Sequence, residues 1–247
     1  MLPLIAFLAG TLLGSFTNVC IYRLPRGQSI IRPPSRCPKC KTRLKPWHNI
    51  PLLSYLLLRG RCAYCGNPIS LRYPLVELLS GLIYLFLFFH LGLGIEFPIY
   101  ALFSTALIII SFHDLEHGLI PDIITLPGMA AGLAVSLFLS IKFLDSLIGL
   151  LVGGGLFLLI AVIWKGGMGG GDVKLGAFVG LFLGWKYTLL AIFIAFFAGA
   201  VVGIALILAK VRGRRDPIPF GPFISVGALI SLLWGEKLIQ WYLTYLK

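Results

Sequence analysis

Long apolar runs recur along this chain and restrict the folds that it can adopt. Hydrophobic residues make up 58% of the sequence and charged residues only 12%. An α-helix needs about 20 consecutive apolar residues to span a bilayer core that is about 30 Å thick, and several runs approach that length. We therefore expect an all-α polytopic membrane protein, in which the lipid bilayer is a partner of the chain.

Eight membrane-spanning helices are predicted from these runs. They cover approximately residues 3–22, 74–92, 97–112, 123–141, 146–164, 173–184, 187–209 and 221–243. The sixth is short, but removing it would place the basic residues that follow the seventh on the wrong side of the membrane. The predicted organisation is a first transmembrane helix (1–22), a cytoplasmic loop module (23–72) and a membrane-embedded core (73–247).

The positive charge of the chain indicates its orientation. The loop 23–72 holds 11 of the 21 Lys and Arg residues, and basic residues stay on the cytoplasmic side. Alternation through eight helices puts six more basic residues on that side and both termini in the periplasm. Those six are Lys165, Lys174, Lys210, Arg212, Arg214 and Arg215. The net charge of +12 thus reflects topology, and we expect no nucleic-acid partner.

Two C-x-x-C pairs lie in the loop 23–72. They are Cys37 with Cys40 and Cys62 with Cys65. Paired knuckles at this spacing are typical of a structural zinc site, in which four thiolates complete a tetrahedral shell. Two disulfides are the alternative, but they do not persist in the reducing cytoplasm. A metal would also stabilise a loop that is too small to bury a core of its own.

Two acidic residues stand at predicted cytoplasmic ends of membrane helices. Asp172 follows a glycine run, 166–171, in which Gly169 and Gly171 would let a substrate backbone approach closely. Asp114 ends the third predicted span, where a carboxylate faces the unfavourable end of the helix dipole. Acids at membrane helices are costly unless they have a task, so both are candidate functional residues. For Asp122, after Pro121, we expect an ordinary helix N-cap.

Three functions compete for these residues. The first is an aspartic-protease dyad, in which Asp114 and Asp172 share one proton. The second is a zinc metalloprotease that uses His113 and His117, whose spacing resembles H-E-x-x-H. The third is a non-enzymatic carrier or assembly factor with proton-relaying aspartates. The metal hypothesis leaves the glycine run without a role, so we favour the dyad.

Two further stretches stay open at this stage. Glu77 either pairs with Arg72 at the membrane interface or takes part in chemistry. The segment 216–222 contains three prolines and either walls a substrate groove or ends a loop.

The chain resembles the type IV prepilin peptidases, bacterial inner-membrane enzymes of the GxGD aspartic protease group. The resemblance rests on six motifs in order along the chain: Gly14 to Asn18, the C-x-x-C pairs around Asn49-Ile-Pro51, Arg72 to Glu77, Asp114 to Asp122, Gly169 to Asp172 and Pro217 to Pro222.

In that family the aspartates that match Asp114 and Asp172 form the catalytic dyad. The resemblance implies cleavage of basic leaders from prepilins or pseudopilins at the cytoplasmic face. It also implies N-methylation of the new amino terminus from S-adenosylmethionine. The sequence assigns no residues to the methyl transfer.

Overall fold

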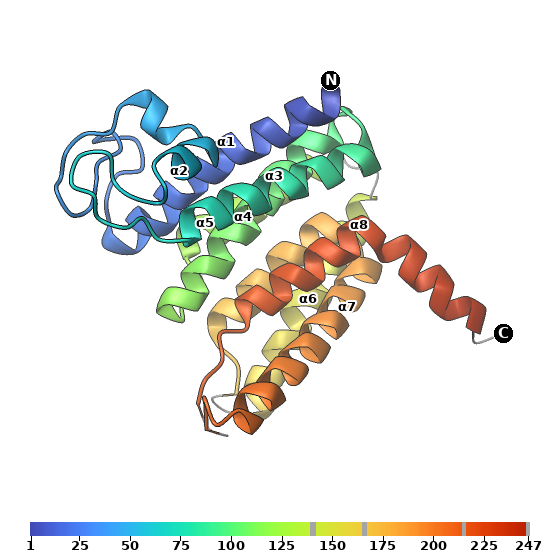
Figure 1. The fold of residues 1–247 in the computed structure, drawn as a ribbon. Coiled ribbons are helices and arrows are strands. Elements are labelled where there is room, and N and C mark those ends of the chain that lie inside the picture. The colour runs from blue at the N-terminus through green and yellow to red at the C-terminus, as the bar shows by residue number, and fades with distance from the viewer. Residues whose placement is uncertain (139–141, 165–166, 214–215, 246–247) are drawn as a thin grey trace. The chain divides into compact units, whose positions relative to one another are not determined.

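The computed structural model describes residues 1–138, 142–164, 167–213 and 216–245, and this part of the chain is mostly helical (Figure 1). Its α-helices are α1 (Leu2–Arg23), α2 (Leu53–Leu57), α3 (Arg72–Leu91), α4 (Glu96–His117), α5 (Asp122–Val135), α6 (Phe143–Ile163), α7 (Gly170–Leu208) and α8 (Gly221–Tyr245). Some predictions from the sequence fall outside the described residues: the end of the predicted span 123–141, at 139–141, and the places assigned to Lys165, Gly166, Arg214 and Arg215.

Within the described ranges, six helices are long and apolar enough to cross a membrane: α1, α3, α4, α6, α7 and α8. Large apolar side chains on these helices remain exposed, as Leu144, Leu151 and Leu158 do on α6, which suits a lipid-facing surface. α5 is apolar but has only 14 residues. The prediction of a mostly helical chain with several candidate membrane-spanning helices is confirmed, whereas the number of eight crossings stays a prediction.

Helix α7 contains a reversal where the sequence predicted a boundary between two spans. Gly184 has φ 71° and ψ 171°, which no helical residue adopts. A Cβ placed on Gly153 of α6 would touch both Gly176 and Thr188. In one straight helix these two residues would lie about 18 Å apart along the axis. The halves of α7 on either side of Gly184 therefore run back along each other against α6.

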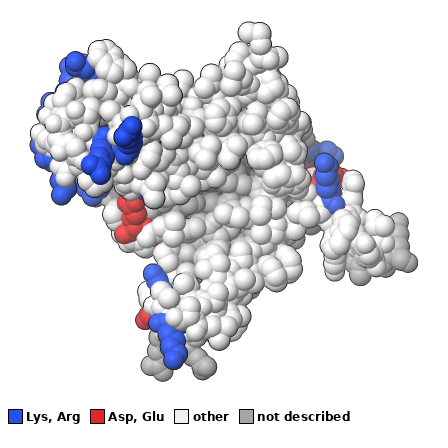
Figure 2. All heavy atoms as spheres, viewed as in Figure 1, with Lys and Arg blue, Asp and Glu red and all other residues white. Residues whose placement is uncertain are grey.

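The described chain forms two compact units, Met1–Phe97 and Pro98–Lys247. In the first, α1 packs along α3 through small residues, because a Cβ on Gly14 would lie 2.8 Å from Cα of Glu77. The segment 24–71 that follows α1 consists mainly of loops, with the short helix α2 and two isolated β-bridges, Arg36 to Arg43 and Arg61 to Pro68. Figure 2 shows Lys and Arg side chains gathered over this segment.

The second unit is held together mainly by α6, α7 and α8. Glycines allow the close approach of α6 to α7, and Phe103 of α4 stacks on Phe182 of α7 with ring centroids 4.6 Å apart. Tyr100 of α4 also donates a hydrogen bond to the Phe182 carbonyl, 3.3 Å long. These contacts position the end of α4 and the start of α7, which carry the two candidate aspartates.

Candidate functional site: two aspartates at helix ends

Asp114 lies in the last turn of α4 and is 5% exposed. Its Oδ2 accepts a hydrogen bond of 2.8 Å from the backbone N–H of Gly221, the first residue of α8. Helix α4 ends three residues later, where Gly118 has φ 64° and donates to the Asp114 carbonyl at 2.7 Å. The side chain of Asp114 is thus held by a neighbouring helix, far away in the sequence.

Asp172 lies in the first turn of α7 and is half-buried. Its Oδ2 accepts a hydrogen bond of 3.1 Å from the N–H of Gly169, and its own N–H donates to the Gly169 carbonyl at 3.1 Å. A carboxylate at a helix N-terminus is stabilised by the positive end of the helix dipole. The glycine run therefore places Asp172 in an electrostatically favourable position.

The fold brings the end of α4, which carries Asp114, towards the start of α7, which carries Asp172. The loop that follows α4 packs against the start of α7, since a Cβ on Gly171 would lie only 2.9 Å from Cβ of Ile120. Gly169 borders the carboxylate itself, because a Cβ there would lie 3.3 Å from Oδ2 of Asp172. Both glycines named from the sequence thus lie next to the acidic pair.

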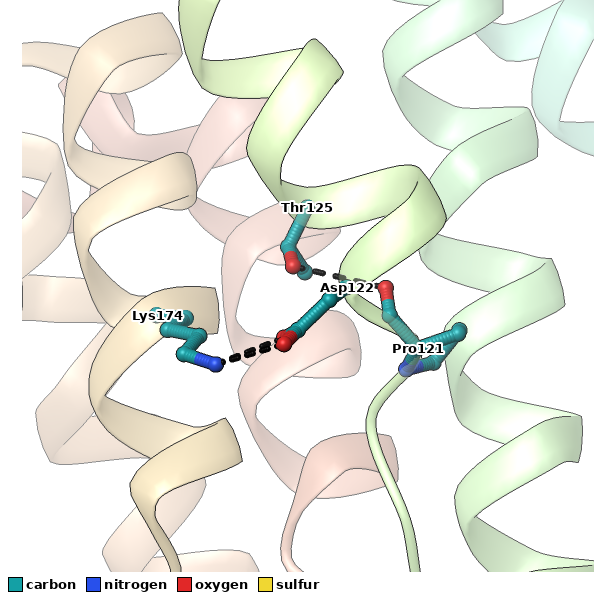
Figure 3. Close-up of polar contacts among 4 residues, drawn as sticks. All are labelled: Pro121, Asp122, Thr125 and Lys174. Carbon is teal, nitrogen blue, oxygen red and sulfur yellow. Dashed lines mark hydrogen bonds and ion pairs between the residues drawn. The ribbon is translucent and has the colours of Figure 1, made fainter.

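Asp122 corrects one expectation. It is the first residue of α5 rather than its N-cap, which is Pro121, and it makes no side-chain cap hydrogen bond. Instead its carboxylate forms an ion pair with Lys174, with Nζ to oxygen distances of 2.7 and 2.8 Å (Figure 3). The hydroxyl of Thr125 donates a hydrogen bond of 3.3 Å to the Pro121 carbonyl. The ion pair joins the start of α5 to the first turn of α7, two residues after Asp172.

The histidines of the alternative metal hypothesis do lie side by side. The rings of His113 and His117 are 5.0 Å apart between centroids and meet edge to face. Nδ1 of His113 donates to the Leu119 carbonyl, 2.6 Å away, because a carbonyl can only accept. Within the described residues, the one cluster of three or more potential metal ligands is formed by cysteines, so this pair has no third protein ligand there.

The four cysteines of the two C-x-x-C pairs converge, as predicted. Their Sγ atoms all lie within 4.8 Å of one another, and all four thiols are free. Cys37 and Cys65 are 3.9 Å apart between Sγ atoms, far longer than a disulfide bond. A zinc ion bound to sulfur at about 2.3 Å in a tetrahedron needs sulfurs about 3.8 Å apart. The cluster therefore fits zinc.

The two cysteine turns have the same backbone geometry. The residue after the second cysteine is left-handed in each, with φ 59° at Lys41 and φ 67° at Gly66. Side-chain and backbone hydrogen bonds from Asn67 lower the pKa of the Cys65 thiol to about 6. A thiol that ionises readily is suited to metal ligation, because the thiolate is the ligand.

Gly221 is a site residue that the sequence argument missed. Its N–H group binds Asp114, so the proline-rich segment before α8 serves to present a backbone donor. The available signal was a glycine with two prolines shortly before it and one directly after it. The sequence did not indicate that its partner is Asp114, because the two residues lie far apart along the chain.

Comparison with known proteins covers nearly all of the chain. Residues 8–91 match the model of the Bacterial Peptidase A24 N-terminal domain, and residues 101–204 match that of the Type IV leader peptidase family. No solved structure matches.

Several curated relatives carry the name prepilin leader peptidase/N-methyltransferase. The one from Stutzerimonas stutzeri is 35% identical, over 99% of this chain and 94% of its own length. The one from Pseudomonas aeruginosa is 34% identical, over 98% and 93%, and the one from Bacillus subtilis is 38% identical, over 97% of both chains.

Proposed function

The chain belongs to the type IV leader peptidase family and is an enzyme, and we propose that it cleaves prepilin-like precursors with Asp114 and Asp172 and then methylates the new amino terminus. The cleaved bond would lie after the basic leader, at the cytoplasmic face of a bacterial inner membrane. Its substrates would be prepilins, the class that the names of its relatives indicate, or the similar pseudopilins.

One observation carries the proposal of a dyad. The loop after α4 packs against the start of α7, and each carboxylate accepts a hydrogen bond from a backbone N–H, that of Gly221 for Asp114 and that of Gly169 for Asp172. In the proposed dyad the two carboxylates meet across one water and cannot both ionise easily, so the pair would share a proton. One carboxylate then takes a proton from water as the water attacks the scissile carbonyl, while the protonated partner donates to the carbonyl oxygen.

The surroundings support this role. A Cβ on Gly169 would meet only the Asp172 carboxylate and the Gly171 nitrogen within 4 Å, so an extended peptide backbone could come close on this side, whereas Gly171 lies against Ile120. The N–H groups of Gly221 and Gly169 hold the carboxylates in place before substrate arrives. Such preorganisation lowers the reorganisation that the reaction requires.

The cysteine cluster supports a separate, structural role. Zinc bound by Cys37, Cys40, Cys62 and Cys65 would have a closed shell with no open position for a substrate. Bound there, the ion would supply folding free energy to a segment that lacks a large apolar core.

The orientation follows from charge. The basic residues over the segment 24–71 favour a cytoplasmic location for it, with the N- and C-termini in the periplasm. A reporter inserted within residues 26–60 should read as cytoplasmic and one at the C-terminus as periplasmic. The opposite reporter results would contradict the proposed cytoplasmic location of the active site.

The decisive experiment compares leader cleavage by purified protein and by its Asp114→Asn and Asp172→Asn variants. Each amide keeps the shape of the side chain but cannot share the proton, so cleavage should fall by roughly 10⁴-fold, with the double variant little worse. Full cleavage by Asp172→Asn would refute the dyad. Loss of cleavage in His117→Ala with rescue by added zinc would support the metalloprotease instead.

A further inference from the structure

The short loop 118–121 connects the end of α4 to the start of α5 and also contacts α7. It begins directly after the last turn of α4, which carries Asp114. Ile120 of the loop packs on α7, since a Cβ on Gly171 would lie 2.9 Å from Cβ of Ile120. Gly171 directly precedes Asp172 in the chain. The shape of this loop therefore influences where the two aspartate-bearing helix ends lie relative to each other.

His113 binds the middle of this loop. Its side chain is only 6% exposed, and its Nδ1 donates a hydrogen bond of 2.6 Å to the Leu119 carbonyl. The side chain of Leu119 is 65% exposed, so its packing does little to hold the peptide. The imidazole thus ties the peptide between Leu119 and Ile120 to the last turn of α4.

Other contacts hold the two ends of the loop. At the α4 end, Gly118 has φ 64° and donates to the Asp114 carbonyl at 2.7 Å. At the α5 end, the ion pair of Asp122 with Lys174 joins the loop to the first turn of α7 (Figure 3). The His113 hydrogen bond acts between these ends, directly before Ile120.

The chemistry that this contact requires of His113 is donation alone. Nδ1 carries a proton both in the charged ring and in the neutral tautomer that binds a carbonyl. A carbonyl that loses its donor inside a protein is destabilised, so the peptide would turn towards another donor. Ile120 would move with the peptide and no longer hold the start of α7 in place.

We propose that His113 is a positioning residue for leader cleavage: by holding the Leu119 carbonyl, it keeps Ile120 against the start of α7 and so fixes the placement of Asp172 relative to Asp114. The inference rests on the proposed function, because it concerns the placement of the proposed dyad. His113 acts through the loop and exchanges no proton with substrate or water.

The test is steady-state leader cleavage by the detergent-purified full chain with two isosteric replacements. His113→Asn places an N–H group where the imidazole carries Nδ1–H, whereas His113→Leu has the same branched shape without a donor. His113→Asn should keep kcat within about threefold of the wild type, and His113→Leu should lower kcat at least about tenfold with little change in KM. A role in helix stability alone predicts the opposite order, because leucine favours a helix more than asparagine does.

Ser111→Ala is the matched control within the same helix. The Ser111 hydroxyl donates a hydrogen bond of 2.7 Å to the Leu107 carbonyl of α4 itself, so its loss leaves the loop in place and cleavage should be normal. Melting temperatures of all three variants report whether each is folded.

Equal cleavage by His113→Asn and His113→Leu would overturn the inference. At the wild-type rate, it would show that the hydrogen bond does not matter, and at a common reduced rate, that the imidazole itself is required. A rise of KM alone in His113→Leu would make the loop a substrate contact, and the inference would also fail. In each case loss of cleavage in Asp172→Asn would leave the proposed dyad standing, whereas full cleavage by Asp172→Asn would refute the dyad itself.

Discussion

The backbone N–H of Gly221 binds Oδ2 of Asp114 at 2.8 Å, across more than a hundred positions of sequence. There is no room for a side chain at Gly221, because a Cβ would lie 2.8 Å from the same oxygen and 3.2 Å from Cγ of Asp114. The glycine thus serves both as a hydrogen-bond donor and as the space in which the carboxylate lies.

Gly221→Ala should therefore displace the Asp114 carboxylate. A misplacement approaching 1 Å can cost about 10²-fold in rate, so cleavage should fall by roughly 10–100-fold while the protein still inserts and folds. The measurement is kcat/KM for leader cleavage. Gly155→Ala on α6 is the control, since a Cβ there meets nothing within 4 Å and should leave the rate unchanged. Equal rates for the two variants would contradict this positioning.

The glycine run offers a second comparison between neighbours. A side chain at Gly171 would collide with Ile120, whereas one at Gly170 meets nothing within 4 Å. Both lie in the first turn of α7, so Gly171→Val and Gly170→Val change helix propensity alike. We expect Gly171→Val to lower cleavage at least about tenfold through displacement of the loop next to Asp172, and Gly170→Val to lower it much less. If the two variants lost similar cleavage activity, the cause would be a disturbed helix start and not the contact with Ile120.

The ion pair of Lys174 with Asp122 should matter more for geometry than for stability. Its side chains are 40% and 53% exposed, and exposed pairs contribute about 0–1 kcal/mol. Lys174→Ala and Asp122→Ala should thus lower the melting temperature little, and each should reduce cleavage severalfold by loosening α5 on α7. A double-mutant cycle on kcat/KM checks this, because the two losses should be non-additive. Fully additive losses would show that the pair does not act as a unit.

Metal analysis tests the cysteine cluster. Protein purified under reducing conditions without chelators should carry about one zinc per chain. Cys37→Ser should lower the zinc content and make the segment 24–71 more sensitive to protease, while leader cleavage falls less. Cys20→Ser is the matched control, since Cys20 is a buried thiol of α1 outside the cluster, and it should keep its zinc. Absence of zinc from the wild type would rule out the zinc module.

Local patterns in the sequence accounted for the elements. The apolar runs predicted helices close to their observed bounds, because every lipid-exposed backbone group must be satisfied within its own helix. They also predicted a break near residue 185, where Gly184 turns α7 back. The paired C-x-x-C motifs predicted the cysteine cluster, because metal ligation imposes a short and regular spacing.

Charge, position and family resemblance together were needed to select Asp114 and Asp172 from the sequence. The residues that bind their carboxylates could be identified only from the fold. Asp122 is an example. Its position after Pro121 predicted a helix N-cap, but its carboxylate instead forms an ion pair with Lys174 of another helix. A contact across helices depends on how two surfaces pack, which no short sequence window encodes.

Taken by itself, the sequence determined the helices, the cysteine module and the family, since these follow from hydropathy, local spacing and motifs. Only the tertiary structure decided that Gly221 holds Asp114, that Lys174 holds Asp122, and that Glu77 accepts a hydrogen bond from the N–H of Leu52. The physical reason is that hydrogen bonds and ion pairs are short-range, and the residues that form them come within range only when distant segments of the chain pack.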